Sequence, residues 1–258
     1  MTDGPLIVQS DKTMLLEVDH ADSVACRKAI APFAELERAP EHIHTYRLTP
    51  LGLWNARAAG HDAESVVDTL IRYSRYPVPN ALLIDVAETM SRYGRLQINT
   101  DPANGLILQA IDVAVLEEVL KSKKVAPLLG TRIDENTVAV HPSERGHLKQ
   151  ALVKLGWPAE DVAGYVDGER HAISLKTDWD AREYQIQAAD GFWHGGSGVV
   201  VLPCGAGKTL VGALAMYRAQ ATTLILVTNT VSARQWRDEL LKRTNLTADE
   251  IGEYSGAK

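Results

Sequence analysis

The hydrophobic pattern of the first hundred residues changes from short apolar runs to helical spacing. The runs at 5–8 and 14–18 predict two strands separated by a turn. Apolar residues then recur with helical periodicity, which predicts helices over residues 22–33, 50–59, 62–74 and 80–93. Thr49 and Asp62 suit N-cap positions, and Pro50 suits a first helical turn. With a further strand expected at 95–99, the pattern indicates a helical, winged-helix-like region.

A turn-rich seam at 101–105 separates this region from a second one. The elements predicted beyond the seam are a strand at 106–108, a helix at 113–120, a hairpin of 132–133 with 137–140, and a helix from 143 to about 155. They predict a small α+β domain that ends near residue 168. The expected domains are therefore 1–104, 105–168 and 173–258.

The third region alternates helical and strand patterns. Its predicted elements are an amphipathic helix at 179–193, a strand at 198–202, a helix at 208–216, a strand at 223–227 and a helix at 231–243. Both strands are short apolar runs of the kind that is buried on both faces of a parallel sheet. Such alternation is typical of a doubly wound sheet, which binds ligands at the carboxyl ends of its strands. The fold class is thus α/β plus α+β.

The turn after the strand at 198–202 has the chemistry of a phosphate-binding loop. Small residues at 205–207 let successive backbone N–H groups point at an anion, and a helix N-terminus adds partial positive charge. Lys208 would reach the β- and γ-phosphates, and the Thr209 hydroxyl would ligate Mg²⁺. Because Leu202 stands where the strict pattern has glycine, a chance glycine-rich turn is the alternative. The order of strand, loop, Lys-Thr and helix favours phosphate binding.

Composition limits the class of protein and the cell compartment that fit the chain. The chain has 258 residues, is 45% hydrophobic and 23% charged, and carries a net charge of −6, which argues against a protein that coats nucleic acid with positive charge. The two cysteines, Cys26 and Cys204, form no disulfide framework, so a reducing cytoplasm fits. We expect no membrane partner, because no leader pattern and no apolar run of about 20 residues occur.

Scattered basic residues and histidines have two interpretations. Four arginines and a lysine cluster are candidates for contacting phosphates, although solvated helix faces and a helix dipole account for them more simply: Arg72, Arg75, Arg92, Arg95, Lys121, Lys123 and Lys124. Histidine pairs occur at 42 and 44 and at 141 and 147. Since no further ligands stand at recognisable metal-binding spacing, we expect structural or surface histidines.

The third region also carries a set of motifs in a characteristic order. Arg182-Glu-Tyr184-Gln185 precedes Leu202-Pro-Cys-Gly-Ala-Gly-Lys-Thr209, and both Val227-Thr-Asn-Thr230 and Arg234-Gln-Trp236 follow. These motifs closely resemble the start of a superfamily 2 helicase, and more narrowly the bacterial and archaeal XPB-type DNA repair helicases (the xeroderma pigmentosum group B family). Such helicases commonly lack the first glycine of the loop. The segments 6–11, 33–37 and 40–46 resemble the family's N-terminal region.

The resemblance implies ATP and Mg²⁺ as cofactors and assigns roles to residues of a RecA-like helicase domain. Gln185, with Arg182, matches the adenine-reading motif, since a side-chain amide can pair with a donor and an acceptor. Thr230 and Arg234 fall where such helicases contact the backbone of one DNA strand, although Val231 replaces an arginine found in related helicases. The resemblance assigns phosphate and Mg²⁺ binding to Pro203, Cys204, Gly205, Ala206, Gly207 and the catalytic pair Lys208 and Thr209.

The resemblance further implies a 3′–5′ DNA helicase that acts on forked or damaged DNA through backbone contacts. Residues 105–168 lie where the family carries a damage-recognition-like domain, and a repair nuclease or other repair proteins are candidate partners. Asp249-Glu250-Ile251-Gly252 only partly matches the family's Asp-Glu-x-His motif. We therefore expect an N-terminal portion that is inactive in hydrolysis and unwinding by itself. The alternative is a non-enzymatic DNA- or protein-binding module with a vestigial half of a nucleotide cleft.

Overall fold

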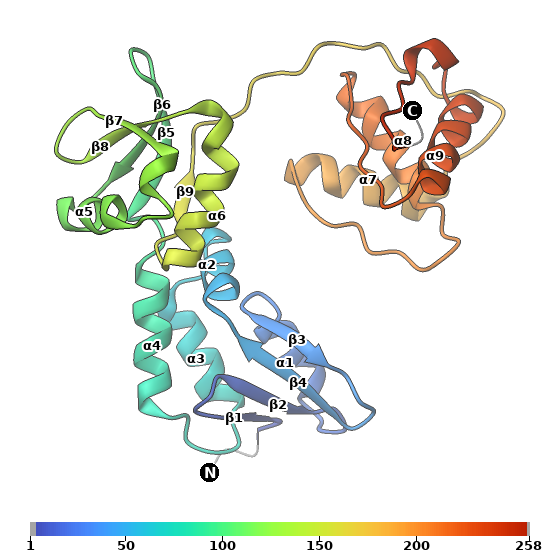
Figure 1. Cartoon of the computed structure of the whole chain (residues 1–258). Coiled ribbons are helices and arrows are strands. Elements are labelled where there is room, and N and C mark those ends of the chain that lie inside the picture. Colours follow the sequence, from blue (N-terminus) through green and yellow to red (C-terminus); the bar gives the residue numbers. More distant parts are fainter. Residues whose placement is uncertain (1–3, 257–258) are drawn as a thin grey trace. The chain divides into compact units, whose positions relative to one another are not determined.

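The structure is a computed structural model that describes residues 4–256. It forms a mixed α/β fold with two sheets and divides into two compact units. Unit 1 ends at Tyr165, and unit 2 begins at Val166. Figure 1 shows both sheets in unit 1 and the helices α7, α8 and α9 in unit 2. Each unit is described by itself.

Unit 1 begins with a four-stranded antiparallel sheet in the order β1-β2-β4-β3. Its strands are β1 (Leu6–Val8), β2 (Thr13–Glu17), β3 (Ala34–Arg38) and β4 (Ile43–Leu48). Four helices accompany the sheet, namely α1 (Ser23–Ile30), α2 (Pro50–Ala58), α3 (Ala63–Tyr73) and α4 (Asn80–Ser91). Sheet and helices enclose one apolar core, in which Leu16, Ile30 and Leu70 are fully buried.

The predicted helix starts are confirmed, but the prediction of a mainly helical region is wrong for β3 and β4. The Thr49 hydroxyl accepts a hydrogen bond from the Gly52 N–H at 3.0 Å, and the Asp62 carboxylate accepts one from the Ser65 N–H at 2.8 Å. β3 is an edge strand with mostly exposed polar side chains, so its own sequence carries little apolar alternation. Its pairing with β4 is what makes it a strand.

A second sheet of five strands, in the order β7-β8-β6-β5-β9, completes unit 1. Its strands are β5 (Leu96–Asp101), β6 (Gly105–Ala110), β7 (Leu129–Arg132), β8 (Thr137–Val140) and β9 (Ala159–Asp161). β9 pairs parallel to β5, whereas all other pairs are antiparallel. The helices α5 (Val113–Lys121) and α6 (Arg145–Leu155), with short 3₁₀ turns at Ala126–Leu128 and Pro142–Glu144, accompany this sheet. A second core contains Leu96, Leu108, Leu116 and Leu152.

The predicted seam at 101–105 coincides with the turn of the hairpin formed by β5 and β6. Asp101 pairs with Gly105, and the Asp101 carboxylate accepts hydrogen bonds from the N–H groups of Ala103 and Asn104. The strand predicted at 95–99 therefore belongs to the second sheet. The domain limits 1–104, 105–168 and 173–258 stay a prediction.

Over its described residues, 166–256, unit 2 consists of three helices joined by long connections. The helices are α7 (Glu183–Gly195), α8 (Lys208–Ala219) and α9 (Thr230–Arg243), and a 3₁₀ turn follows at Ala248–Glu250. α8 packs against both of the other helices. Two backbone hydrogen bonds hold residues 169–176 against the ends of α8 and α9. The His171 N–H donates to the Gln220 carbonyl after α8, and the Lys176 N–H donates to the carbonyl of Arg243 at the end of α9.

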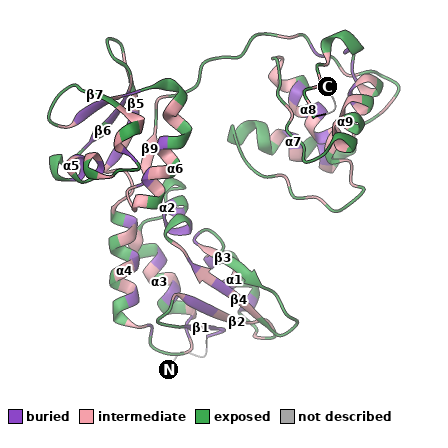
Figure 2. Cartoon of the chain, viewed as in Figure 1, coloured by how far each residue is buried: buried purple, intermediate pink, exposed green. Residues whose placement is uncertain are grey.

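The two buried parallel strands predicted for unit 2 are not present as strands. Within residues 4–256, the stretches 198–202 and 223–227 pair with no other strand, and Val201 and Leu224 are 87% and 83% exposed. Figure 2 shows this contrast, with buried residues along the strands of unit 1 and exposed ones along the connections of unit 2. A strand needs neighbouring strands to satisfy its backbone, and the described part of unit 2 offers none.

Candidate phosphate loop and nucleotide site

The predicted phosphate loop leads directly into α8. Gly205 and Gly207 have φ angles of 77° and 76°, a left-handed region that glycine adopts without steric cost. Gly207 is the N-cap of α8, so Lys208 and Thr209 are the first residues of the helix. The loop therefore ends where unpaired backbone N–H groups and the positive end of a helix dipole favour an anion.

The Lys208 side chain folds back over the loop that precedes it. Its ammonium group donates to the carbonyls of Leu202 at 2.7 Å and Pro203 at 3.0 Å. The side chain is exposed, whereas Thr209 is half-buried. Lys208 is thus held at the loop by two backbone carbonyls.

The start of α7 contacts the loop through two side chains. Tyr184 Oη and Gln185 Nε2 each donate to the Ala206 carbonyl at 2.8 Å. Gln185 is 3% exposed, and its Oε1 accepts from the Arg182 N–H at 3.0 Å. The structure thereby brings Arg182 and Gln185 together with the predicted loop.

The predicted DNA-contacting residues lie on another helix. Thr230 is the first residue of α9, and Arg234 lies one turn further on; both are exposed. The Asn229 side chain caps this helix by accepting from the Ser232 N–H at 2.8 Å. Within residues 4–256, no hydrogen bond joins Thr230 or Arg234 to the phosphate loop.

α9 contacts α8 through an indole placed over a glycine. A Cβ atom on Gly212 would lie 2.3 Å from Cη2 of Trp236, so only glycine leaves room for this contact. The sequence patterns predicted no role for the Tyr184 hydroxyl, for Gly212 or for Asn229. The only signal for the Gly212–Trp236 contact is a glycine inside an otherwise good helix, which often marks close packing.

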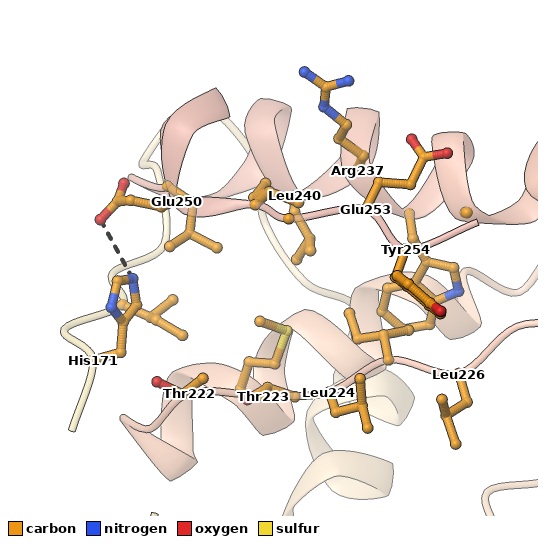
Figure 3. Close-up of a pocket in the computed structure, with 18 of the residues that line it drawn as sticks. His171, Thr222, Thr223, Leu224, Leu226, Arg237, Leu240, Glu250, Glu253 and Tyr254 are labelled. Carbon is orange, nitrogen blue, oxygen red and sulfur yellow. Dashed lines mark ion pairs between the residues drawn. The ribbon is translucent and has the colours of Figure 1, made fainter. Parts of the chain in front are cut away.

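A cavity of about 530 Å³ lies elsewhere in unit 2 and contains none of the predicted site residues. Figure 3 shows Leu224, Leu226 and Tyr254 beside it, with the ion pair of His171 and Glu250 at 3.3 Å. Glu250 also accepts from the backbone N–H and the hydroxyl of Thr247. The Thr247 hydrogen bonds, with His171 nearby, lower the pKa of Glu250. Glu250 therefore caps the 3₁₀ turn that follows α9.

The four arginines considered for phosphate contacts all have partners within unit 1. Arg75 forms an ion pair with Glu17, Arg92 pairs with Glu88 at 3.0 Å, and Arg95 pairs with Asp112 at 3.5 Å. Arg72 lies over the Tyr73 ring, with 5.4 Å from its Cζ to the ring centroid. These contacts agree with the simpler interpretation of structural, partly solvated side chains.

Residues 4–256 hold no group of three or more His, Cys, Asp or Glu side chains arranged to bind a metal ion. None of the helices in this described range is long and apolar enough to cross a membrane.

Two family models match the chain. A model described as "Helicase conserved C-terminal domain" matches residues 6–134, and one described as "Type III restriction enzyme, res subunit" matches residues 178–258. The first covers half of the chain and places it among the helicases. The second begins just before α7 and contains the whole candidate site.

Similar curated proteins narrow this class. The chain is 78% identical to the DNA 3′-5′ helicase XPB of Kineococcus radiotolerans and 71% identical to that of Mycobacterium tuberculosis, each over 100% of this chain and 46% or 47% of the relative. It is 34% identical to the putative DNA 3′-5′ helicase Rad25 of Halobacterium salinarum, over 67% of this chain and 28% of the relative. The chain belongs to the XPB family of DNA 3′-5′ helicases. It spans about half the length of the bacterial relatives that it matches.

Proposed function

We propose that unit 2 binds ATP, as part of a DNA 3′-5′ helicase, through the loop between Pro203 and Thr209. The observation that carries the proposal is the convergence of three features. A loop with two left-handed glycines opens α8, a lysine lies folded over that loop, and α7 contacts the loop through Tyr184 and Gln185.

The residues present fit a nucleotide phosphate. The first N–H groups of α8 have no acceptor inside the helix, and Lys208 supplies a cation beside them. Thr209 would hold the Mg²⁺ that accompanies the nucleotide, and this ion would neutralise phosphate charge. Pro203, Cys204 and Ala206 complete the loop that would surround the phosphates of the nucleotide.

We assign the recognition of adenine to Gln185, with Arg182 beside it. One Nε2 hydrogen of Gln185 and one lone pair of its Oε1 are used within the chain, which leaves one donor and one lone pair for a base. The burial of this amide limits its rotation, so the remaining donor and acceptor keep a fixed direction. A fixed donor-acceptor pair can distinguish adenine from guanine.

The nucleotide proposal is tested by titrating ADP and GDP into the 258-residue chain. ADP is expected to bind more tightly than GDP, and Lys208→Ala is expected to weaken both nucleotides strongly. Lys242→Ala, which removes an exposed lysine at the other end of α9, is the matched control and should change neither. Unchanged ADP affinity in Lys208→Ala would refute the phosphate role, and equal affinities for ADP and GDP would refute the adenine role.

We propose that Thr230 and Arg234 contact the phosphate backbone of DNA, with forked or damaged DNA as substrate and repair proteins such as a nuclease as partners. Both side chains are exposed at the start of α9, where the helix dipole favours phosphate. Binding is expected to be sequence-independent and to weaken with salt, and losing one phosphate contact lowers the slope of log affinity against log salt by about 0.9. Fluorescence anisotropy of Arg234→Ala with forked and plain duplexes measures this slope. A strong preference for one base sequence contradicts the proposal.

A further inference from the structure

Two hydrogen-bond donors from α7 converge on one carbonyl of the phosphate loop. Tyr184 Oη and Gln185 Nε2 both lie 2.8 Å from the Ala206 oxygen. Both residues stand in the first turn of α7, one after the other in the sequence. Both lone pairs of that carbonyl are thus used, and the Ala206 oxygen is directed toward α7.

The direction of this carbonyl sets the direction of the next N–H group. Because the peptide unit is planar and trans, the C=O of Ala206 and the N–H of Gly207 point in opposite directions. Within the range 4–256, no acceptor pairs with the Gly207 N–H. This N–H therefore points away from α7 and is free to bind a ligand.

Gly207 is confined from the same side. A Cβ atom at this position would lie 2.6 Å from Gln185 Nε2, and the left-handed φ angle of 76° also favours glycine. α7 therefore touches both the carbonyl before Gly207 and the Cα position of Gly207 itself. Rotation of the peptide unit between Ala206 and Gly207 would break both hydrogen bonds.

The two donors differ in what else they do. The Gln185 amide is tied to the Arg182 backbone as well as to the loop, and it belongs to the proposed adenine site. Among the residues that the structure describes, the Tyr184 hydroxyl has one further hydrogen-bond partner, a guanidinium nitrogen of Arg182 at 3.4 Å. Its hydrogen-bond donation goes to the loop alone.

We propose that Tyr184 is a positioning residue for phosphate binding: its hydroxyl holds the Ala206 carbonyl toward α7 so that the Gly207 N–H faces a nucleotide phosphate. This proposal rests on the proposed function of the loop. Without the hydroxyl, the peptide unit is held by Gln185 alone and can turn its carbonyl toward the phosphates, where an oxygen repels an anion. Tyr184 thereby acts on the phosphates through the loop and has no contact with the base.

The test compares Tyr184→Phe with the unaltered chain, using ADP, GDP and inorganic pyrophosphate as probes. Phenylalanine keeps the ring and removes only the hydroxyl. The dissociation constants for all three probes are expected to rise by one common factor of about 3 to 10, the effect of one lost hydrogen bond. The preference for ADP over GDP stays unchanged, whereas Gln185→Ala reduces that preference. Tyr217→Phe, which alters an exposed tyrosine on α8, is the matched control and should change nothing.

A second measurement reports on the loop itself. The amide resonance of Gly207 is expected to shift when pyrophosphate saturates the unaltered chain, and to shift less in saturated Tyr184→Phe. Unchanged affinity for pyrophosphate in Tyr184→Phe, together with strong loss in Lys208→Ala, overturns the positioning role while the proposed function stands. A changed ADP to GDP ratio in Tyr184→Phe also overturns it, because the tyrosine would then act on the base. Unchanged binding in Lys208→Ala refutes the proposed function itself.

Discussion

Unit 1 and unit 2 place similar apolar stretches in opposite environments. Leu108, in the central strand β6 of unit 1, is fully buried, whereas Leu224, in an equally apolar stretch of unit 2, is 83% exposed. Every strand of unit 1 pairs with at least one neighbour, while the corresponding stretches of unit 2 pair with none among the described residues. The helices of unit 2 form nevertheless, because a helix satisfies its backbone within itself. The comparison shows that a helix needs no partner for its backbone hydrogen bonds, whereas a strand does.

The largest expected difference between the units is in backbone protection. Amide hydrogens of Gly105–Ala110 should exchange at least about 10³-fold more slowly than those of residues 223–227. Exchange in this central strand requires an opening that costs much of the global free energy of unfolding. Hydrogen exchange followed by mass spectrometry measures both segments in one sample. Similar rates in the two segments would mean that the stretch 223–227 is paired in solution.

A leucine truncation in each unit sharpens the same comparison. Leu108→Ala should lower the free energy of unfolding of unit 1 by about 2–5 kcal/mol, because it leaves a cavity in a closed core. Leu224→Ala should change the stability of unit 2 by no more than about 0.5 kcal/mol. Urea unfolding, followed in each unit by hydrogen exchange, gives the change in the free energy of unfolding for each variant. A large loss from Leu224→Ala would show that this side chain is covered in solution.

Two helical glycines of unit 2 should respond in opposite directions to alanine. Gly212→Ala is expected to destabilise unit 2 by about 1–3 kcal/mol, because the new methyl group overlaps the rigid Trp236 indole. Gly191→Ala, in α7 with nothing within 4 Å, should gain up to about 1 kcal/mol from helix propensity. Thermal unfolding of the two variants decides the point. Stabilisation by Gly212→Ala would mean that α8 and α9 do not pack through this contact.

Unit 1 contains an acid-sensitive ion cluster at β9. The Asp161 carboxylate accepts from Arg145 at 2.6 and 3.0 Å and from Lys149 at 2.9 Å. Burial raises the pKa of Asp161, but the bonds and charges from Arg145 and Lys149 outweigh this and hold it below the ordinary value of 3.8. Since the pKa is lowered on folding, the stabilisation is present above pH 3.8 and disappears as the pH falls below it.

Replacement of this carboxylate tests the cluster. Asp161→Asn should lower the free energy of unfolding by about 1.5–3 kcal/mol at pH 7, the range for hydrogen bonds to charged groups. The difference from the unaltered chain should shrink below pH 3.8. Asp68→Asn, on an exposed position of α3, serves as the control with no expected effect. Urea unfolding at pH 7 and pH 3 gives both differences. A loss that is equally large at pH 3 would exclude the ionised carboxylate as its source.

The smallest effects are expected at helix caps, where the two units should behave alike. Thr49→Ala at α2 and Asn229→Ala at α9 each remove one side-chain acceptor from a first helical turn. Each should cost about 1 kcal/mol. Circular dichroism during urea unfolding measures the change. An effect confined to unit 1 would show that α9 is not formed as a capped helix in solution.

Local signals located most of the elements of this chain. The caps at Thr49 and Asp62, the hairpin of β7 and β8, and the loop before α8 all depend on neighbours a few residues apart. β3 was missed because its own sequence has little alternation of apolar and polar residues. Strands were predicted at 198–202 and 223–227 because the residue types there suit a buried sheet. A local pattern does not show whether a neighbouring strand is available for pairing.

For the candidate site, sequence alone determined the residue types: two glycines, a Lys-Thr pair at a helix start, and a Tyr-Gln pair upstream. Only the tertiary structure decided that Tyr184 and Gln185 meet on one carbonyl, and that Trp236 lies on Gly212. The physical reason is the range of the forces involved. A turn or a cap forms through backbone geometry within one stretch of chain. The contacts of Tyr184, Gln185 and Trp236 form only after the helices have packed. Many packings satisfy the same local pattern, so the sequence pattern does not determine these contacts.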